Sequence, residues 1–291
     1  MAHTFSSGKL LTVMVVMMIL LLPAWVHADD SLFSVSLGAE YASGDYGTGI
    51  RTDSVFIPLT VAVYPAQRLD FSLEIPFVYQ SSSAVVAGQF MGMQNQSMGA
   101  SSGTMAAAAV MGGSMGPGPR TTASAATIGQ SHYGLGDMTL KAGYVLYTEE
   151  NHVPAIRPNV FVKFPTADKN KFLGTGAFNE GFGVELSKWF GSWLADGEMG
   201  YTFQGKSTVL DVKDYLYYSA GIGYQVSQRF RPMLIFKGNT APVAGATSQL
   251  EARLRIKYQF TKHTGIDGYL AKGITAASPD YGTGLSVCYE F

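Results

Sequence analysis

The sequence is poor in charge and in cysteine, and beyond its amino terminus it has no long apolar run. Charged residues make up 14% of its 291 residues, against about 25% in ordinary soluble domains. Cys288 is the single cysteine, which excludes an intrachain disulfide and a cysteine metal cluster. The formal net charge of −1 gives no reason to expect a nucleic-acid partner. We therefore expect no metal ion, no cofactor and no nucleic acid.

The amino terminus has the composition of a secretory signal. Lys9 precedes a nearly continuous apolar run over residues 10–22, and Val26-His27-Ala28 supplies the small residues of a cleavage site. The run is too short for a spanning helix, which needs about 20 residues. No cysteine lies near the cleavage site, which argues against a lipoprotein. We expect a signal peptide over residues 1–28 and a mature chain over residues 29–291.

Most of the mature chain alternates apolar with polar residues at a period of two, which indicates β-strands. The expected strands cover residues 33–41, 55–63, 69–79, 138–146, 156–164, 182–186, 193–203, 216–224, 230–236, 250–260, 266–270 and 285–291. In lipid every backbone polar group must be paired internally, so a membrane protein without apolar helices must be a closed barrel. The sequence predicts an all-β fold, an antiparallel transmembrane β-barrel of twelve strands.

The connections between these strands alternate in length. Long connections cover residues 43–53, 81–133, 165–178, 204–213, 238–248 and 272–281, whereas the others are short. Bacterial outer-membrane barrels have short periplasmic turns and longer external loops. A large soluble β-sandwich would alternate in polarity too, but it has no need of such regular lengths. We expect a Gram-negative outer membrane, with its lipid as a partner.

Residues 81–131 interrupt the alternation. The segment is built mostly from Gly, Ser, Ala, Met and Gln, which predicts a low-complexity external loop or a partial plug of the lumen. It contains Met91, Met93, Met98, Met105, Met111 and Met115. Thioethers are soft ligands that suit Cu(I) or Ag(I). The run 106–109 divides the methionines into two loose groups, so the interpretation as a loop without metal is favoured.

The carboxyl-terminal strand has one apolar side, formed by Leu285, Val287, Tyr289 and Phe291, and the chain ends on this last aromatic residue. This pattern resembles the signal by which the barrel-assembly machinery recognises its substrates. We therefore expect Tyr289 and Phe291 to act as the assembly signal and this machinery to be a partner.

Charges alternate with apolar residues along the expected strand 250–260. Arg253, Arg255 and Lys257 share one side, and an Arg or Lys on the lipid side at the midplane would cost about 2–4 kcal/mol. We therefore expect them to face a narrow lumen with a basic wall and a more acidic wall. The expected solute-pathway residues are Glu40, Asp70, Glu74, Arg231, Lys237, Glu251, Arg253, Arg255 and Lys257. The alternative is that these charges pair across the lumen and rigidify a nearly closed barrel.

Four short motifs carry a family resemblance. They are Gly134-Leu135-Gly136-Asp137, Lys163-Phe164-Pro165-Thr166-Ala167-Asp168, Gly174-Thr175-Gly176 and Ser278-Pro279-Asp280-Tyr281-Gly282. Together they resemble the outer-membrane transporters of the MetA-pathway of phenol degradation family. Ala167 stands where that family's Pro-Thr-Gly-Asp has Gly. The resemblance implies a barrel that passes organic compounds, aromatic ones among them.

Three functions remain to be compared. The favoured one is a channel or transporter for small aromatic or hydrophobic organic solutes. The second is a structural or surface-display barrel without transport. An outer-membrane enzyme is disfavoured, because His132, His152 and His263 of the mature chain fall at strand ends or turns and no matching serine partner emerges.

Overall fold

A computed structural model describes residues 32–83, 130–208 and 211–291. The predicted signal peptide over residues 1–28 lies outside the described residues, as do most of the predicted loop 81–131 and its six methionines. These two expectations remain predictions.

The described residues form thirteen β-strands and one short 3-10 helix, η1. They are β1 (Phe33–Gly44), β2 (Thr52–Ala66), β3 (Leu69–Gln80), β4 (His132–Leu135), β5 (Met138–Tyr144), β6 (Ala155–Phe164), η1 (Lys169–Lys171), β7 (Asn179–Phe190), β8 (Trp193–Gln204), β9 (Tyr215–Tyr224), β10 (Phe230–Asn239), β11 (Gln249–Gln259), β12 (Thr264–Gly273) and β13 (Tyr281–Glu290). Among them no helix has the length and apolar character that crossing a bilayer requires.

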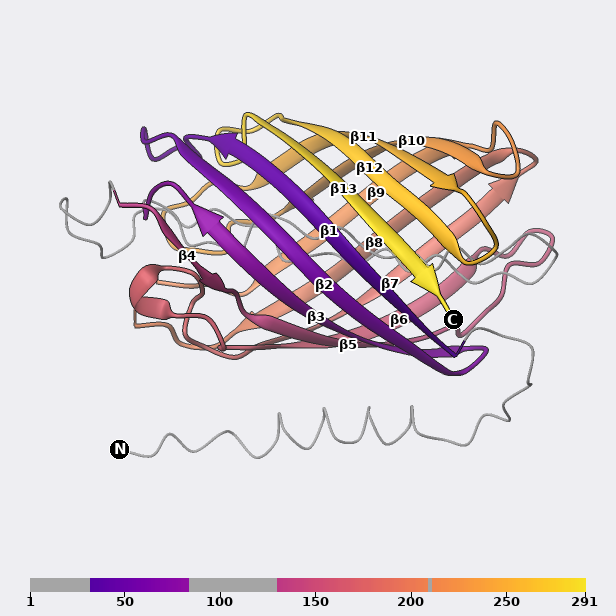
Figure 1. Cartoon of the computed structure of the whole chain (residues 1–291), viewed down its shortest axis with the longest axis horizontal. Helices are drawn as coiled ribbons and strands as arrows, with labels where there is room; N and C mark the ends of the chain where they lie inside the picture. The colour runs from indigo at the N-terminus through magenta and orange to yellow at the C-terminus, as the bar shows by residue number, and fades with distance from the viewer. Residues whose placement is uncertain (1–31, 84–129, 209–210) are drawn as a thin grey trace.

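The sheet closes on itself (Figure 1). Each strand pairs antiparallel with its neighbours, and β1 pairs both with β2 and with β13. At the closing seam Ser34 lies opposite Glu290, and the Phe291 N–H donates to the Phe33 carbonyl at 2.9 Å. Strands β4 and β5 both pair with β3, through Phe77 opposite Leu135 and Glu74 opposite Thr139. They are two parts of one interrupted strand, so the prediction of a closed twelve-stranded barrel is confirmed.

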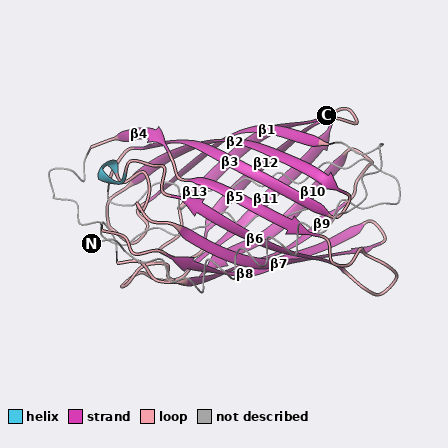
Figure 2. Ribbon diagram, turned by 90° about the horizontal axis from the view of Figure 1, so that it is seen from below, coloured by secondary structure: helices cyan, strands magenta, loops and turns pink. Residues whose placement is uncertain are grey.

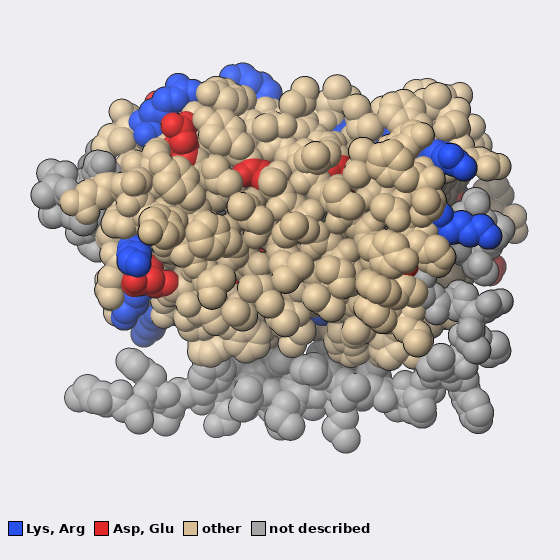
Figure 3. Space-filling model, viewed as in Figure 1, with Lys and Arg blue, Asp and Glu red and all other residues tan. Residues whose placement is uncertain are grey.

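Side chains alternate between the interior and the outer surface, as on a transmembrane barrel. On β11, Leu254 and Ile256 are 50% and 42% exposed, whereas Arg253 and Arg255 are each 7% exposed. Charged side chains gather mainly near the two ends of the face drawn in Figure 3, and the broad band between them shows little charge. Exposed aromatic residues lie near both ends of the wall, among them Phe190, Trp193 and Phe291 at one end and Tyr133, Phe178 and Tyr281 at the other. Such girdles mark the two membrane interfaces.

Several strand ends differ from the expected bounds by a few residues, as in β7, and two further local features differ from the sequence-based expectation. A turn was expected from residue 64, but β2 continues to Ala66 through an irregularity between Val63 and Ala66 that periodicity does not reveal. Strand β4 lies where a loop was expected, because four residues are too few for an alternation to indicate a strand. Figure 2 shows η1 beside β4, at the end of the barrel opposite the carboxyl terminus.

Candidate functional site: the charged interior of the barrel

The nine residues expected in the solute pathway lie on the inward faces of four strands, β1, β3, β10 and β11. Five of them, Glu40, Glu251, Arg253, Arg255 and Lys257, are buried. Asp70, Glu74, Arg231 and Lys237 are partly buried and share the side of their strands that carries Val78 on β3 and Met233 on β10. The structure spreads the nine over the height of the barrel and does not gather them at one point. Their contact with a solute remains a prediction.

The basic residues of β11 pair with carboxylates on their own wall. The Arg255 guanidinium holds Asp267 of β12, with Nε 2.8 and 2.9 Å from the two carboxylate oxygens. Lys257 Nζ lies 3.8 Å from Asp267, and Arg253 forms an ion pair with Glu251. Sequence reasoning missed Asp267, although the period-two alternation of the expected strand 266–270 places it opposite the apolar residues.

A phenol links this wall to the acidic one. The Tyr269 hydroxyl on β12 donates to Glu40 Oε2 on β1 at 2.8 Å. The Arg253 guanidinium lies over the Tyr269 ring, 4.4 Å from its centroid, a favourable arrangement of a cation on an aromatic face. Strand β13 stands between β12 and β1, so the hydrogen bond from Tyr269 to Glu40 passes across the interior face of β13.

A second network joins five strands on the other side of the barrel. Arg157 of β6 binds Asp70 of β3 in a bidentate manner, with donor–acceptor distances of 3.0 and 2.5 Å, and Glu185 of β7 at 2.6 Å. Lys141 of β5 reaches the same Glu185 at 3.1 Å and Glu198 of β8 at 4.0 Å. Only Asp70 had been predicted as a site residue, although period-two alternation already places the others on the polar faces of their strands.

A glycine makes room for this network. A Cβ added at Gly143, on β5, would stand 2.0 Å from a terminal nitrogen of Arg157. The guanidinium therefore packs against bare backbone, and its burial depends on glycine at this position.

Two walls of the interior carry opposite formal charge. Strands β10 to β12 direct five basic residues inward, Arg231, Lys237, Arg253, Arg255 and Lys257, against two acidic residues, Glu251 and Asp267. Strands β13 and β1 to β3 direct inward Glu290, Glu40, Asp70 and Glu74. Among the described residues, the first wall thus has a formal excess of positive charge and the second an excess of negative charge, and Asp70 of the second wall pairs with Arg157 of β6.

Three of the family motifs meet at the end of the barrel that carries β4. Asp137, in the break between β4 and β5, forms an ion pair with Lys163 Nζ at 3.1 Å and accepts the Ala167 N–H at 3.1 Å. Thr166 Oγ1 donates to the Gly136 carbonyl at 2.8 Å. A Cβ at Gly174 would lie 2.5 Å from Asp137 Oδ1. We call Gly136, Asp137, Lys163, Thr166, Ala167 and Gly174 the motif cluster; it attaches the loop 165–178 to the wall.

Alanine at position 167 does not disturb this attachment. Ala167 is absent from the described residues with positive φ, so its backbone conformation does not require glycine. Its N–H is satisfied by Asp137 and its side chain is 8% exposed.

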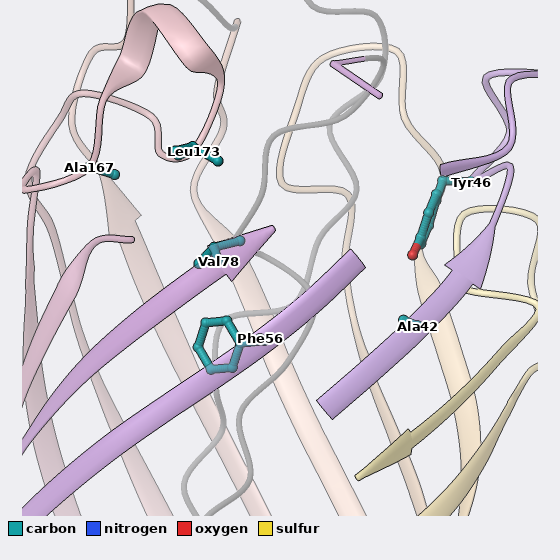
Figure 4. Close-up of a cluster of buried hydrophobic side chains, with 6 residues drawn as sticks. All are labelled: Ala42, Tyr46, Phe56, Val78, Ala167 and Leu173. Carbon is teal, nitrogen blue, oxygen red and sulfur yellow. The ribbon is translucent and has the colours of Figure 1, made fainter. Parts of the chain in front are cut away.

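Next to the motif cluster, a group of buried apolar side chains lies at the barrel mouth (Figure 4). The mouth cluster consists of Ala42, Tyr46, Phe56, Val78, Ala167 and Leu173. Tyr46 and Phe172, the residue before Leu173, have φ of 53° and 55°, a region that costs non-glycine residues about 1–3 kcal/mol. Burial raises the pKa of the Tyr46 phenol. Two connecting loops thus each carry a buried aromatic residue in a left-handed backbone conformation.

A closed barrel with an apolar outer band and a charged interior is a bacterial outer-membrane β-barrel. A family model described as "Putative MetA-pathway of phenol degradation" matches residues 60–291. The chain belongs to this family, and the resemblance drawn from its motifs is confirmed.

Solved structures share the fold. An outer membrane channel from Pseudomonas putida F1 is 13% identical with a TM-score of 0.65, over 93% of this chain and 97% of that chain. The NanC porin is 9% identical with a TM-score of 0.51, over 88% of this chain and 100% of that chain. A search of curated protein sequences found no match.

Proposed function

We propose that this protein is a channel of the outer membrane for small organic solutes, aromatic ones among them. The observation that carries the proposal is the charged interior of the closed barrel. Burying a charge is costly, and a barrel with only a structural role would fill its interior more cheaply with apolar side chains. Lys141, Arg157, Glu185 and Glu198 instead keep their charged groups inside the wall.

The number of strands and the family support the same function. Eight strands enclose a space that side chains fill and sixteen or more leave a wide channel, so twelve suit a narrow passage. The family description names phenol degradation, and the solved structure from Pseudomonas putida is a channel. We infer from these that the passage accepts organic molecules of the size of one aromatic ring.

Catalysis has little support in the arrangement of the histidines. His132 begins β4, His152 lies in the turn before β6, and His263 lies in the turn before β12. His263 Nδ1 contacts the Glu290 carbonyl at 3.0 Å. Within the described ranges no histidine bonds to a serine hydroxyl or a carboxylate, as a Ser–His–acid set would require.

The decisive experiment separates a channel from a structural barrel. Folded protein reconstituted in a planar bilayer should give discrete conductance steps, which benzoate or benzyl alcohol should reduce. Uptake of both solutes into proteoliposomes should exceed uptake into protein-free vesicles. A folded barrel with neither conductance nor uptake would refute the channel and favour the structural or surface-display role. Lipase and protease assays on the same preparation test the enzyme.

A further inference from the structure

The interior carries an aromatic and basic patch near the end where the chain terminates. We define the end patch as Trp189, Leu194, Arg231, Met233 and Ile235. Leu194, Met233 and Ile235 are at most 6% exposed and form an apolar floor, against which Trp189 packs. Trp189 and Arg231 are only partly buried, so each keeps some accessible surface. The apolar floor therefore has an aromatic residue and a cation at its edge.

Arg231, the cation of this patch, has a hydrogen-bond donor without an acceptor among the described residues. The Arg231 guanidinium lies 5.4 Å from the centroid of the Trp189 ring, and its Nε is buried with no hydrogen-bond partner among the described residues. Within the described part of the chain, no carboxylate forms an ion pair with Arg231. A buried donor without a partner costs about 1–3 kcal/mol. A ligand that accepts this hydrogen bond would recover that loss.

A second cation stands directly beside it. Arg231 of β10 is in register with Lys257 of β11, and like charges opposite one another across two strands repel. The nearest carboxylate to Lys257, that of Asp267, lies 3.8 Å away and is held by Arg255 in three contacts of 2.6 to 2.9 Å. Asp196 of β8 also acts electrostatically on Arg231. Three basic side chains, Arg231, Arg255 and Lys257, therefore share two carboxylates in this part of the interior.

We propose that the end patch binds an aromatic carboxylate, with the ring against Trp189 and the carboxylate on Arg231, beside Lys257. Guanidinium and ammonium groups are the partners of a carboxylate, and an aromatic face with an apolar floor takes a ring. Benzyl alcohol lacks the carboxylate and acetate lacks the ring, so neither can make both contacts. The inference rests on the proposed function, because a solute must enter the interior to reach the patch.

Calorimetry on the folded barrel in detergent tests the binding without requiring transport. Benzoate should bind the unaltered protein, whereas acetate and benzyl alcohol should bind at least about tenfold more weakly, the ratio that corresponds to one charge-assisted hydrogen bond. Arg231→Gln and Trp189→Leu should each weaken benzoate by a similar factor. The matched control is Arg229→Gln, a change in the exposed turn two residues before Arg231; it should leave binding unchanged.

The outcomes distinguish this site from the channel itself. Equal benzoate affinity in Arg231→Gln and the unaltered protein, with both heat-modifiable and folded, would overturn the proposal. So would benzyl alcohol or acetate binding as tightly as benzoate. Benzoate binding that depends on Arg231, in a protein without conductance, would refute the channel and keep the site. Conductance without benzoate binding would refute the site and keep the channel.

Discussion

The rings of Phe33 and Phe291 stack with their centroids 4.2 Å apart and an interplanar angle of 15°. Phe33 begins β1 and Phe291 follows β13. Their contact therefore covers the seam between these two strands on the outer surface, beside the hydrogen bond between the Phe291 N–H and the Phe33 carbonyl. Tyr289 adds an edge contact to Phe291, with ring centroids 4.7 Å apart. The two residues expected to form an assembly signal therefore also cover the seam.

Replacing Phe291 with Lys should reduce the amount of assembled barrel, because the terminal strand loses both its stacking on Phe33 and its terminal aromatic residue. Phe291→Tyr should assemble normally. The measurement is the heat-modifiable, protease-resistant fraction in outer membranes. Phe260→Lys is the control, since Phe260 is another exposed aromatic in a turn at the same end. Equal assembly of Phe291→Lys and the control would contradict recognition of the terminal residue.

Replacing Arg157 with Met should destabilise the barrel by about 3–5 kcal/mol, because Asp70 and Glu185 would remain without their cation. Gly143→Ala should act in the same direction, since the new methyl group would displace the guanidinium. Urea unfolding in detergent measures both. At Gly282, also inward-facing, an added Cβ would make only ordinary contacts of 3.4 Å and more. Gly282→Ala should be near neutral, and a matching loss there would contradict the specific role of Gly143.

Replacing Asp137 with Ala should release the loop 165–178 from the wall, because Lys163 loses its ion pair and the Ala167 N–H its acceptor. Trypsin should then cut faster after the exposed Lys169 and Lys171. Asp137→Asn should have a smaller effect, since the amide oxygen can still accept from Ala167. Asp280→Asn, an exposed position before β13, is the control. Unchanged cleavage in Asp137→Ala would show that other contacts hold the loop.

Changing Arg253 and Arg255 together to Glu should shift ion selectivity toward cations, because the wall of β10 to β12 would exchange a positive excess for a negative one. Reversal potentials under a salt gradient measure the shift. Arg229→Glu, in an exposed turn, should leave them unchanged. If conductance persists in the double variant with the original selectivity, these two residues lie outside the ion path.

Excising residues 84–128 should leave the barrel folded. Gln80 of β3 and His132 of β4 are in register, so the two ends that the segment joins already lie side by side and a short hairpin connection suffices. Heat-modifiable mobility of the shortened protein measures folding. Loss of the folded form would mean that the segment belongs to the barrel, whereas a folded form with higher conductance would identify it as a plug.

The sequence by itself determined the strands and the direction of their side chains. In β11, polar and apolar residues alternate over more than three pairs. Only one orientation of such a strand places Leu254 in lipid and keeps Arg253 and Arg255 out of it. The sequence alone therefore predicted the strand positions and their inward faces. The same alternation determined the number of strands, and the alternating loop lengths indicated the class of barrel. Both signals are local, because lipid imposes the same requirement on every strand separately.

Only the tertiary structure decided which inward residues meet. Arg157 binds Asp70, 87 residues away in the sequence, and Tyr269 binds Glu40, 229 residues away. Such pairings depend on the stagger between strands and on the closure of the sheet, neither of which appears in an alternation along a single strand. The same holds for the motif cluster and the end patch. Asp137 and Lys163, or Trp189 and Arg231, become neighbours only when the barrel wraps their strands around one interior.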